Sequence, residues 1–226
     1  MKTTDYTVIR SRRRSLELRL YPDSRIEVRV PLRASAREVE DFIASKSAWL
    51  QARLRGQQLR PPRIPLQYRH GEEHLFLGQH YPLSLARAAR PATALQQGSL
   101  CLLAPEPDNP ERIARQLERW YRQQADGVFN RLIDHHFPFF AVRGHIRPQL
   151  RIRSMKSRWG SLSSLGYINL NLELIKTPLH SIEYVVIHEL CHLEHMNHGP
   201  AFQALMSQCL PDWRRRKREL NEMPLR

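Results

Sequence analysis

The strongest constraint on this chain is a short polar string, His188-Glu189-Leu190-Cys191-His192, inside an apolar segment. Aliphatic residues recur there at helical spacing, at Ile182, Val185, Val186, Leu190 and Leu193, which predicts a helix. Residues four apart lie on one face of a helix with their Cβ atoms about 5–6 Å apart, so His188 and His192 can reach a single metal ion. Glu189 lies roughly 100° further around the helix and flanks that ion without binding it.

A carboxylate at this position can take a proton from zinc-bound water, because zinc lowers the pKa of that water towards about 7. The string therefore predicts metal-assisted hydrolysis, with Zn²⁺ as the cofactor and Glu189 as the general base. The competing interpretation is an accidental string with a pair of surface histidines. The apolar helix before it, and a further histidine at the chain reversal after it, favour the metal site.

Two histidines compete for the role of third ligand. His195 lies seven residues after His188 and faces the same way on a straight helix, but three ligands on one helix would be nearly coplanar with the metal, whereas zinc prefers a tetrahedral arrangement. His198 follows the turn at Asn197 and can approach from outside that line. The sequence therefore favours His198 over His195 and leaves the fourth position to water. Cys191 is expected to be a buried apolar residue and not a ligand.

Length and composition point to a folded protein of more than one part. The chain has 226 residues, of which 41% are hydrophobic and 26% charged. The three cysteines are an odd number at wide spacing, and the amino-terminal residues lack the apolar core of an export signal, so we expect a reducing cytoplasmic location. No segment reaches the ~18 consecutive apolar residues of a membrane span, so no membrane partner is expected.

The predicted architecture is α+β. Alternating apolar and charged residues predict a hairpin between residues 16–20 and 26–30, and Ser35 with Glu38 predicts the capped start of a helix. The proline-rich segment 104–110 predicts a domain boundary. We therefore expect a strand-rich module with one helix at residues 1–105 and the metal-binding domain at residues 106–226.

A second hairpin is expected before the metal-binding helix, between strands at 150–153 and 167–172. Its connection carries Arg158, which could bind an anionic substrate group or only brace the hairpin, and Gly160, which is expected to permit a tight bend. Trp159 is expected to pack in the core. Asn169 alternates out of the second strand, which we expect to be an edge that could pair with an extended peptide.

A net charge of +14, carried mostly by arginine, raises affinity for polyanions. The densest basic clusters are Arg10 with Arg12 to Arg14, Arg151 with Arg153, Lys156 and Arg158, and Arg214 to Arg218. An arginine-rich composition can also arise from codon bias, and the basic residues are spread along the chain, so charge alone identifies no ligand. A nucleotide and a nucleic acid both remain candidate partners beside a peptide.

The segment His188 to Phe202, reading HELCHLEHMNHGPAF, resembles the YgjP-like metallopeptidase family, together with the upstream segments MKSRWGS and YINLNLELIKTP. The resemblance covers nearly the whole chain, and the zinc motif is also similar to those of the WLM and SprT-like proteases. It implies a zincin-like (minigluzincin-type) fold with His188, His192 and His198 as ligands and Glu189 as catalytic base. Leu162 replaces a cysteine often found in the family, which argues against a thiol role there.

Three functions are compatible with these observations. The first is a zinc metallopeptidase, the second a metal-dependent nucleoside triphosphate pyrophosphohydrolase using the same site, and the third a DNA-associated protease or DNA-binding module. The sequence leaves the oligomeric state open.

Overall fold

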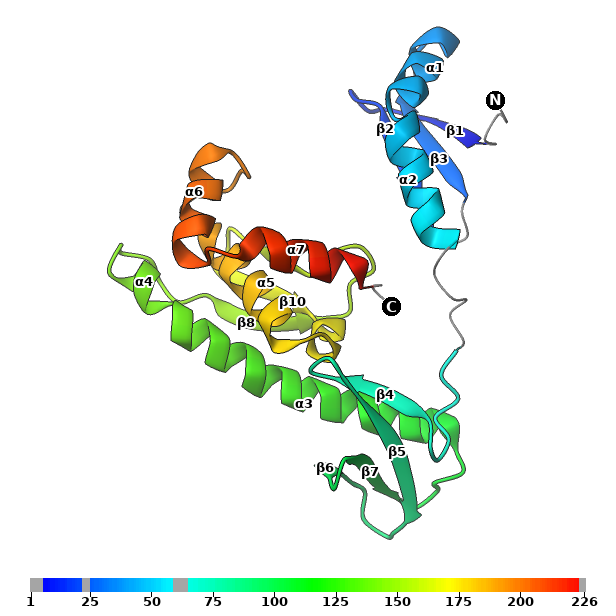
Figure 1. The fold of residues 1–226 in the computed structure, drawn as a ribbon, viewed down its shortest axis with the longest axis vertical. Coiled ribbons are helices and arrows are strands. Elements are labelled where there is room, and N and C mark those ends of the chain that lie inside the picture. The colour runs from blue at the N-terminus through cyan, green and yellow to red at the C-terminus, as the bar shows by residue number, and fades with distance from the viewer. Residues whose placement is uncertain (1–5, 22–24, 59–64, 224–226) are drawn as a thin grey trace. The chain divides into compact units, whose positions relative to one another are not determined.

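The computed structural model of the protein describes residues 6–21, 25–58 and 65–223. Its contacts divide the chain into two compact units, Met1–Pro65 and Leu66–Arg226. Strands and helices occur in both units, which confirms the α+β class. Figure 1 shows the elements of each unit.

A three-stranded sheet forms the smaller unit, in the order β1 (Tyr6–Ser11), β3 (Ile26–Pro31) and β2 (Glu17–Leu20). The predicted hairpin is present as antiparallel β2 and β3, and β1 pairs with β3 in parallel. The capping box is also confirmed, since Ser35 and Glu38 exchange hydrogen bonds at the start of α1 (Ala36–Ser45). The one helix expected here is divided in two, because α1 ends at its C-cap Lys46 and α2 (Ser47–Gln58) follows. The core of this unit consists of Ile26, Val28, Val30, Val39 and Leu50.

The larger unit opens with a four-stranded sheet, in the order β4 (Glu73–Phe76), β5 (Gln79–Arg87), β7 (Ser99–Ala104) and β6 (Ala92–Gln96). The 27-residue α3 (Pro110–His136) follows, and the side chain of Asn109 accepts a hydrogen bond from the Arg112 N–H at its start. Pro110 is the first residue of the helix, where its missing N–H leaves no bond unmade. The proline-rich segment is therefore a tight, capped connection and not a linker.

The division of the chain differs from the predicted boundary after residue 105. Strands β4 to β7 pack with the elements that follow them: the Tyr121 hydroxyl on α3 donates to the Leu75 carbonyl at 2.7 Å. The turn between β4 and β5 docks through the Gly78 N–H, which donates to the Lys176 carbonyl at 3.0 Å. One continuous core joins these strands to α3 and the later helices. The compact unit therefore begins about forty residues earlier than the prolines suggested.

A second sheet has the order β8 (Gln149–Arg153), β10 (Tyr167–Asn171) and β9 (Gly160–Leu162). The expected hairpin between 150–153 and 167–172 is wrong, because β8 and β10 run parallel and β9 forms the antiparallel hairpin with β10. The three-residue β9 is too short to show an alternating pattern, so the sequence did not predict this strand. Strand β10 is consequently central, and the expectation that Asn169 lies on an edge strand is also wrong.

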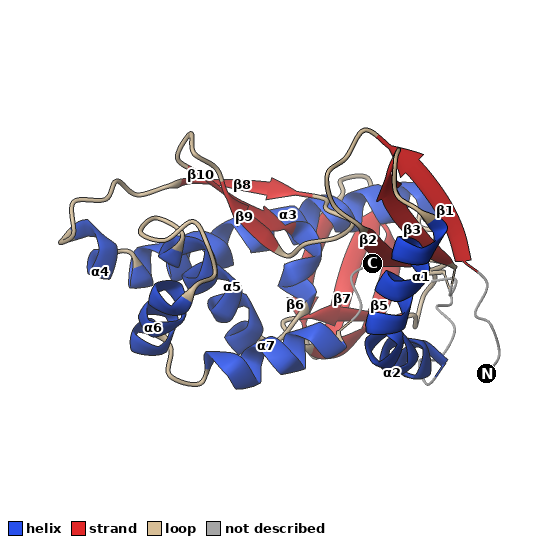
Figure 2. Cartoon of the chain, turned by 90° about the horizontal axis from the view of Figure 1, so that it is seen from above, coloured by secondary structure: helices blue, strands red, loops and turns tan. Residues whose placement is uncertain are grey.

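Helix α5 (Leu179–Cys191) lies at the centre of the carboxy-terminal part of the larger unit, and the 3-10 helix η1 (Leu172–Lys176) leads into it. The sheet β8–β10–β9 lies on one side of α5, and α6 (Pro200–Cys209) and α7 (Trp213–Glu222) lie on the other (Figure 2). The long α3 runs along α5 and continues into the short α4 (Pro138–Ala141) (Figure 1). Within the described ranges, no helix is both long and apolar enough to cross a bilayer.

The two placements of the boundary predict different behaviour of truncated chains. A fragment of residues 66–226 keeps its whole core and should unfold in one cooperative thermal transition. A fragment of residues 106–226 loses Phe76, Leu83, Leu100 and Leu102 from that core. Each such loss costs about 2–5 kcal/mol, and four together match or exceed the roughly 5–15 kcal/mol that stabilise a whole domain. Circular dichroism melts of the two fragments test this, and a cooperative melt of the shorter one would contradict it.

Candidate metal centre

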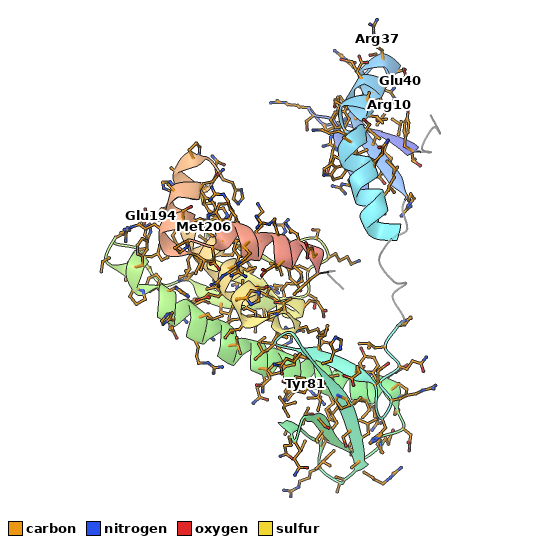
Figure 3. All side chains as sticks on the ribbon, viewed as in Figure 1. Arg10, Arg37, Glu40, Tyr81, Glu194 and Met206 are labelled. Atoms are coloured by element: carbon orange, nitrogen blue, oxygen red, sulfur yellow. The ribbon has the colours of Figure 1, made fainter. Side chains whose placement is uncertain are left out.

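The end of α5 determines how the histidines are arranged. His188 lies in the last turn of α5, and His192 is its C-cap residue, so the helix ends before it could carry His195 on the same face. The chain then reverses, and His198 lies just before α6, which begins at Pro200. Glu194 in the reversal, labelled in Figure 3, pairs with Arg143 at 3.3 Å and so ties the reversal to the segment after α4.

This reversal brings three imidazoles together. The ligand atoms of His188, His192 and His198 all lie within 4.8 Å of one another, and no other such group of His, Cys, Asp or Glu occurs in the described parts of the chain. The Nε2 atoms of His188 and His198 are 3.0 Å apart. A tetrahedral zinc ion with Zn–N bonds of about 2.0–2.1 Å needs nitrogen atoms about 3.3 Å apart. The measured pair is close to this separation, and the three convergent imidazoles could hold a metal ion such as zinc.

The surroundings of His188 and His198 favour the neutral form that metal binding requires, and a hydrogen bond fixes one ring nitrogen of His192. The Nδ1 atom of His192 lies 2.9 Å from the His195 carbonyl, which can only accept, so Nδ1 carries a proton and Nε2 is the ring nitrogen available to a metal. Burial, together with the nearby His192 and His198, lowers the pKa of His188 to about 3. The pKa of His198 is also lowered, mainly by burial. His195 therefore contributes its backbone carbonyl to the centre and not its ring.

Phe202 supports all three rings, a role that the sequence alone did not reveal. Its ring centroid lies 5.0, 4.8 and 4.8 Å from those of His188, His192 and His198. The side chain is 2% exposed and comes from the first turn of α6. No local pattern in the sequence could have found it, because His198 lies before the start of α6 and Phe202 lies within that helix. Phe202 thus packs beneath the three imidazoles as an apolar support.

Glu189 lies beside the histidines as a buried acid, with 4% of its surface exposed. Burial raises the pKa of its carboxyl to about 8, although a hydrogen bond from the Leu162 backbone N–H and the positive charge of Arg158 oppose the shift. Its Oε2 atom has no hydrogen-bond partner in the described structure. A nearby cation lowers such a pKa, so metal binding would favour the carboxylate form, which can accept a proton.

The other candidates of the sequence lie around this acid. Arg158 is exposed and acts electrostatically on Glu189, whereas Asn169 uses its amide to donate to the Ser161 carbonyl at 3.3 Å. Trp159 packs against the main core, as expected. Gly160 does not form the expected tight bend, because it belongs to β9, pairs with Leu170, and its φ is not positive.

Burial determines the chemical state of two further side chains of α5, Cys191 and Tyr184. Cys191 is fully buried, and its thiol hydrogen bonds with that of Cys209, which raises the pKa of Cys191. It is outside the group of convergent ligands, as expected. Tyr184 is 6% exposed with its ring centroid 5.8 Å from that of His188, and burial with the charge of Glu189 raises its pKa to about 12. Its phenol therefore keeps its proton.

Several arginines of the basic clusters are already partnered. In the carboxy-terminal cluster, Arg215 pairs with Glu219 at 2.9 Å, and Arg216 pairs with Glu183 and with Asp212. In the amino-terminal cluster, Arg10, labelled in Figure 3, donates to the Leu32 and Ala34 carbonyls, and Arg13 pairs with Glu17. The Arg151 guanidinium lies 3.2 Å from the centroid of the Tyr167 ring. These contacts commit part of the positive charge to the fold.

Helix α5 with its C-cap residue carries two of the three convergent histidines, with a buried glutamate between them. This arrangement defines a candidate metal-dependent hydrolase centre. The sequence matches the YgjP-like family model, described as "YgjP-like, metallopeptidase domain", over residues 14–223. The chain belongs to this family of metallopeptidases.

Among solved structures, the metallopeptidase zymogen of Pyrococcus abyssi abylysin is 23% identical over an alignment covering 41% of this chain and 90% of that chain, with a TM-score of 0.36. A comparison with curated proteins finds no match. The assignment to the family therefore rests on the family match alone.

The geometry predicts which histidines matter for metal content. Replacing His188, His192 or His198 by Ala should each lower metal affinity by more than the ~10–100-fold typical of losing a group that only supports a ligand. His195→Ala is the matched control, because the backbone carbonyl that holds His192 survives the substitution. Elemental analysis of the four purified variants measures this. Loss of metal from His195→Ala with retention in His198→Ala would reverse the assignment.

Proposed function

We propose that this protein is a zinc-dependent metallopeptidase that cleaves peptide bonds, with His188, His192 and His198 as zinc ligands and Glu189 as general base. The observation that carries the proposal is the convergence of three imidazoles within 4.8 Å beside a buried carboxyl. Membership of a metallopeptidase family supports a peptide or protein substrate.

The donor set favours zinc among the metals. Zinc accepts imidazole ligands in a tetrahedral site, and a catalytic zinc site keeps one position open when three protein ligands are present. When bound there, Zn²⁺ supplies Lewis-acid chemistry, because it acidifies water and polarises a carbonyl oxygen.

Glu189 performs the proton transfers. Its carboxylate accepts a proton from the attacking water and then delivers it to the nitrogen of the leaving amine. Its free Oε2 atom and its burial suit this role, because the oxygen has no competing hydrogen bond and bulk water does not screen the carboxylate. The backbone N–H of Leu162 holds the carboxyl group.

Arg158 is our candidate for binding an anionic group of the substrate or the oxyanion that forms on its carbonyl. Its exposed guanidinium is close enough to lower the pKa of Glu189, and it carries a charge that a substrate can reach. For Asn169 a direct substrate contact is less well supported, because its amide is engaged with Ser161. We therefore assign Asn169 to the support of β9.

Nucleotide hydrolysis and DNA binding stay predictions of the sequence. Their basis was the net charge of +14 and the arginine-rich composition, and the ion pairs of Arg13, Arg215 and Arg216 occupy guanidinium groups that phosphates would otherwise bind. A DNA titration at two salt concentrations and a nucleoside triphosphate assay distinguish them from peptidase activity, since phosphate contacts weaken steeply with salt. We place the activity in the reducing cytoplasm, which the three free cysteine thiols support.

The zinc-loaded protein should contain about one zinc ion per chain and cleave casein or a peptide library. Glu189→Gln keeps the size of the side chain but cannot accept the proton. We expect this variant to keep its zinc and to lose at least the ~10²-fold in rate typical of a missing general base. Peptide release and zinc content are measured on the same samples. Undiminished cleavage by Glu189→Gln would rule out its role as the base.

A further inference from the structure

The carboxylate of Glu189 occupies the space that a side chain at position 160 would need. A Cβ atom added to Gly160 would lie 2.7 Å from Oε1, 2.9 Å from Cγ and 3.0 Å from Cδ of Glu189. Among the other glycines of residues 65–223, only Gly78 shares such a close approach, and its neighbour is Pro178. The backbone of β9 is thus the surface on which the carboxyl group rests.

Glycine is not needed at position 160 for its backbone conformation. Gly160 lies in a strand, pairs with Leu170, and has no positive φ, so an alanine could adopt the same dihedral angles. The requirement is therefore one of space alone. Any strain in a Gly160→Ala protein should arise from the contact with Glu189 and should disappear when that side chain is shortened.

The backbone around Gly160 is fixed by a buried asparagine of β10. Asn171 is 0% exposed, and its amide donates to the Met155 carbonyl at 2.7 Å and to the Arg158 carbonyl at 3.0 Å. Its own N–H donates to the Trp159 carbonyl at 2.8 Å. One residue of β10 thereby holds both ends of the segment that leads into Gly160, so β9 cannot easily retreat.

The other side of the contact is equally fixed. Nine of the thirteen residues of α5 are buried, including Leu190 and Cys191 directly after Glu189. A close-packed helix of this kind does not shift to accommodate an added methyl group. With both backbones held, the Glu189 side chain is the part that must move.

We propose that Gly160 is a positioning residue for Glu189: its missing side chain makes the space in which the carboxyl group lies beside the three histidines. Asn171 maintains that space by fixing the segment before β9. The steric part of this inference stands on the contact alone, and its catalytic consequence rests on the proposed function of Glu189.

A stability cycle in the full-length chain tests the steric part without any activity assay. Gly160→Ala should lower the melting temperature by roughly 3–10 °C, as overpacking does in a domain of this size. The loss should be the same in a Glu189→Gln background, where the side chain keeps its size, and should nearly vanish with Glu189→Ala, where the clashing atoms are gone. Equal losses in all three backgrounds would overturn the proposal.

Gly127→Ala is the matched control. It makes the same chemical change within α3, where the new Cβ meets only the Arg131 guanidinium at 3.4 Å. Alanine is favoured over glycine in a helix, so the melting temperature should hold or rise in every Glu189 background. A background-dependent loss from this control would show that the cycle reports general weakening of the Glu189 variants and would also overturn the proposal.

Kinetics test the catalytic consequence. With a peptide substrate, Gly160→Ala should keep its zinc and its KM but lose at least tenfold in kcat. Gly127→Ala should keep the wild-type zinc content, KM and kcat. Glu189→Asp, which is shorter by one methylene, should cost a smaller factor in the Gly160→Ala protein than in the wild type. A wild-type kcat for Gly160→Ala would refute the positioning role. A wild type that cleaves no peptide, with the stability coupling intact, would instead refute the proposed function and leave the contact established.

Discussion

The burial of α5 is the constraint on which the rest of the larger unit depends. A helix that is apolar on nearly every side must be covered on every side. The sheet β8–β10–β9, α3, α6 and α7 provide that cover, and the core of the unit is continuous through them. The polar groups of its last turn, His188 and Glu189, are therefore held among packed elements from the moment the helix docks. Such groups are costly to bury, which makes a chemical role their best explanation.

The candidate metal centre is built where this buried helix stops. Because α5 ends at His192, the following residues can reverse direction and return His198 to the side of His188. The reversal is held by the hydrogen bond from His192 to the His195 carbonyl, and the returning segment is anchored by Phe202 in α6. A longer helix would have carried His195 along its own axis and left the three imidazoles in a line. The end of the helix is thus as important to the centre as the spacing of its histidines.

The short strand β9 completes the surroundings of Glu189. β9 contributes the space at Gly160, the backbone N–H of Leu162 and, just before it, the charge of Arg158. Its position is set by pairing with β10 and by the hydrogen bonds of Asn171. The acid on the helix and the strand that seats it come from segments separated by about thirty residues, so only the docking of the sheet on α5 brings them together.

The sequence by itself determined the α+β class, the helix with His188, Glu189 and His192, and the buried place of Cys191, because these depend on local periodicity and on four-residue spacing. Tertiary structure alone decided the extent of the larger unit, the order of β8, β9 and β10, and the roles of Phe202, Gly160 and Asn171. Strand order and close contacts depend on residues distant in the chain, and no local pattern records them. A glycine required for the space it leaves has the same letter as one required for a turn, and only the neighbouring Glu189 tells them apart.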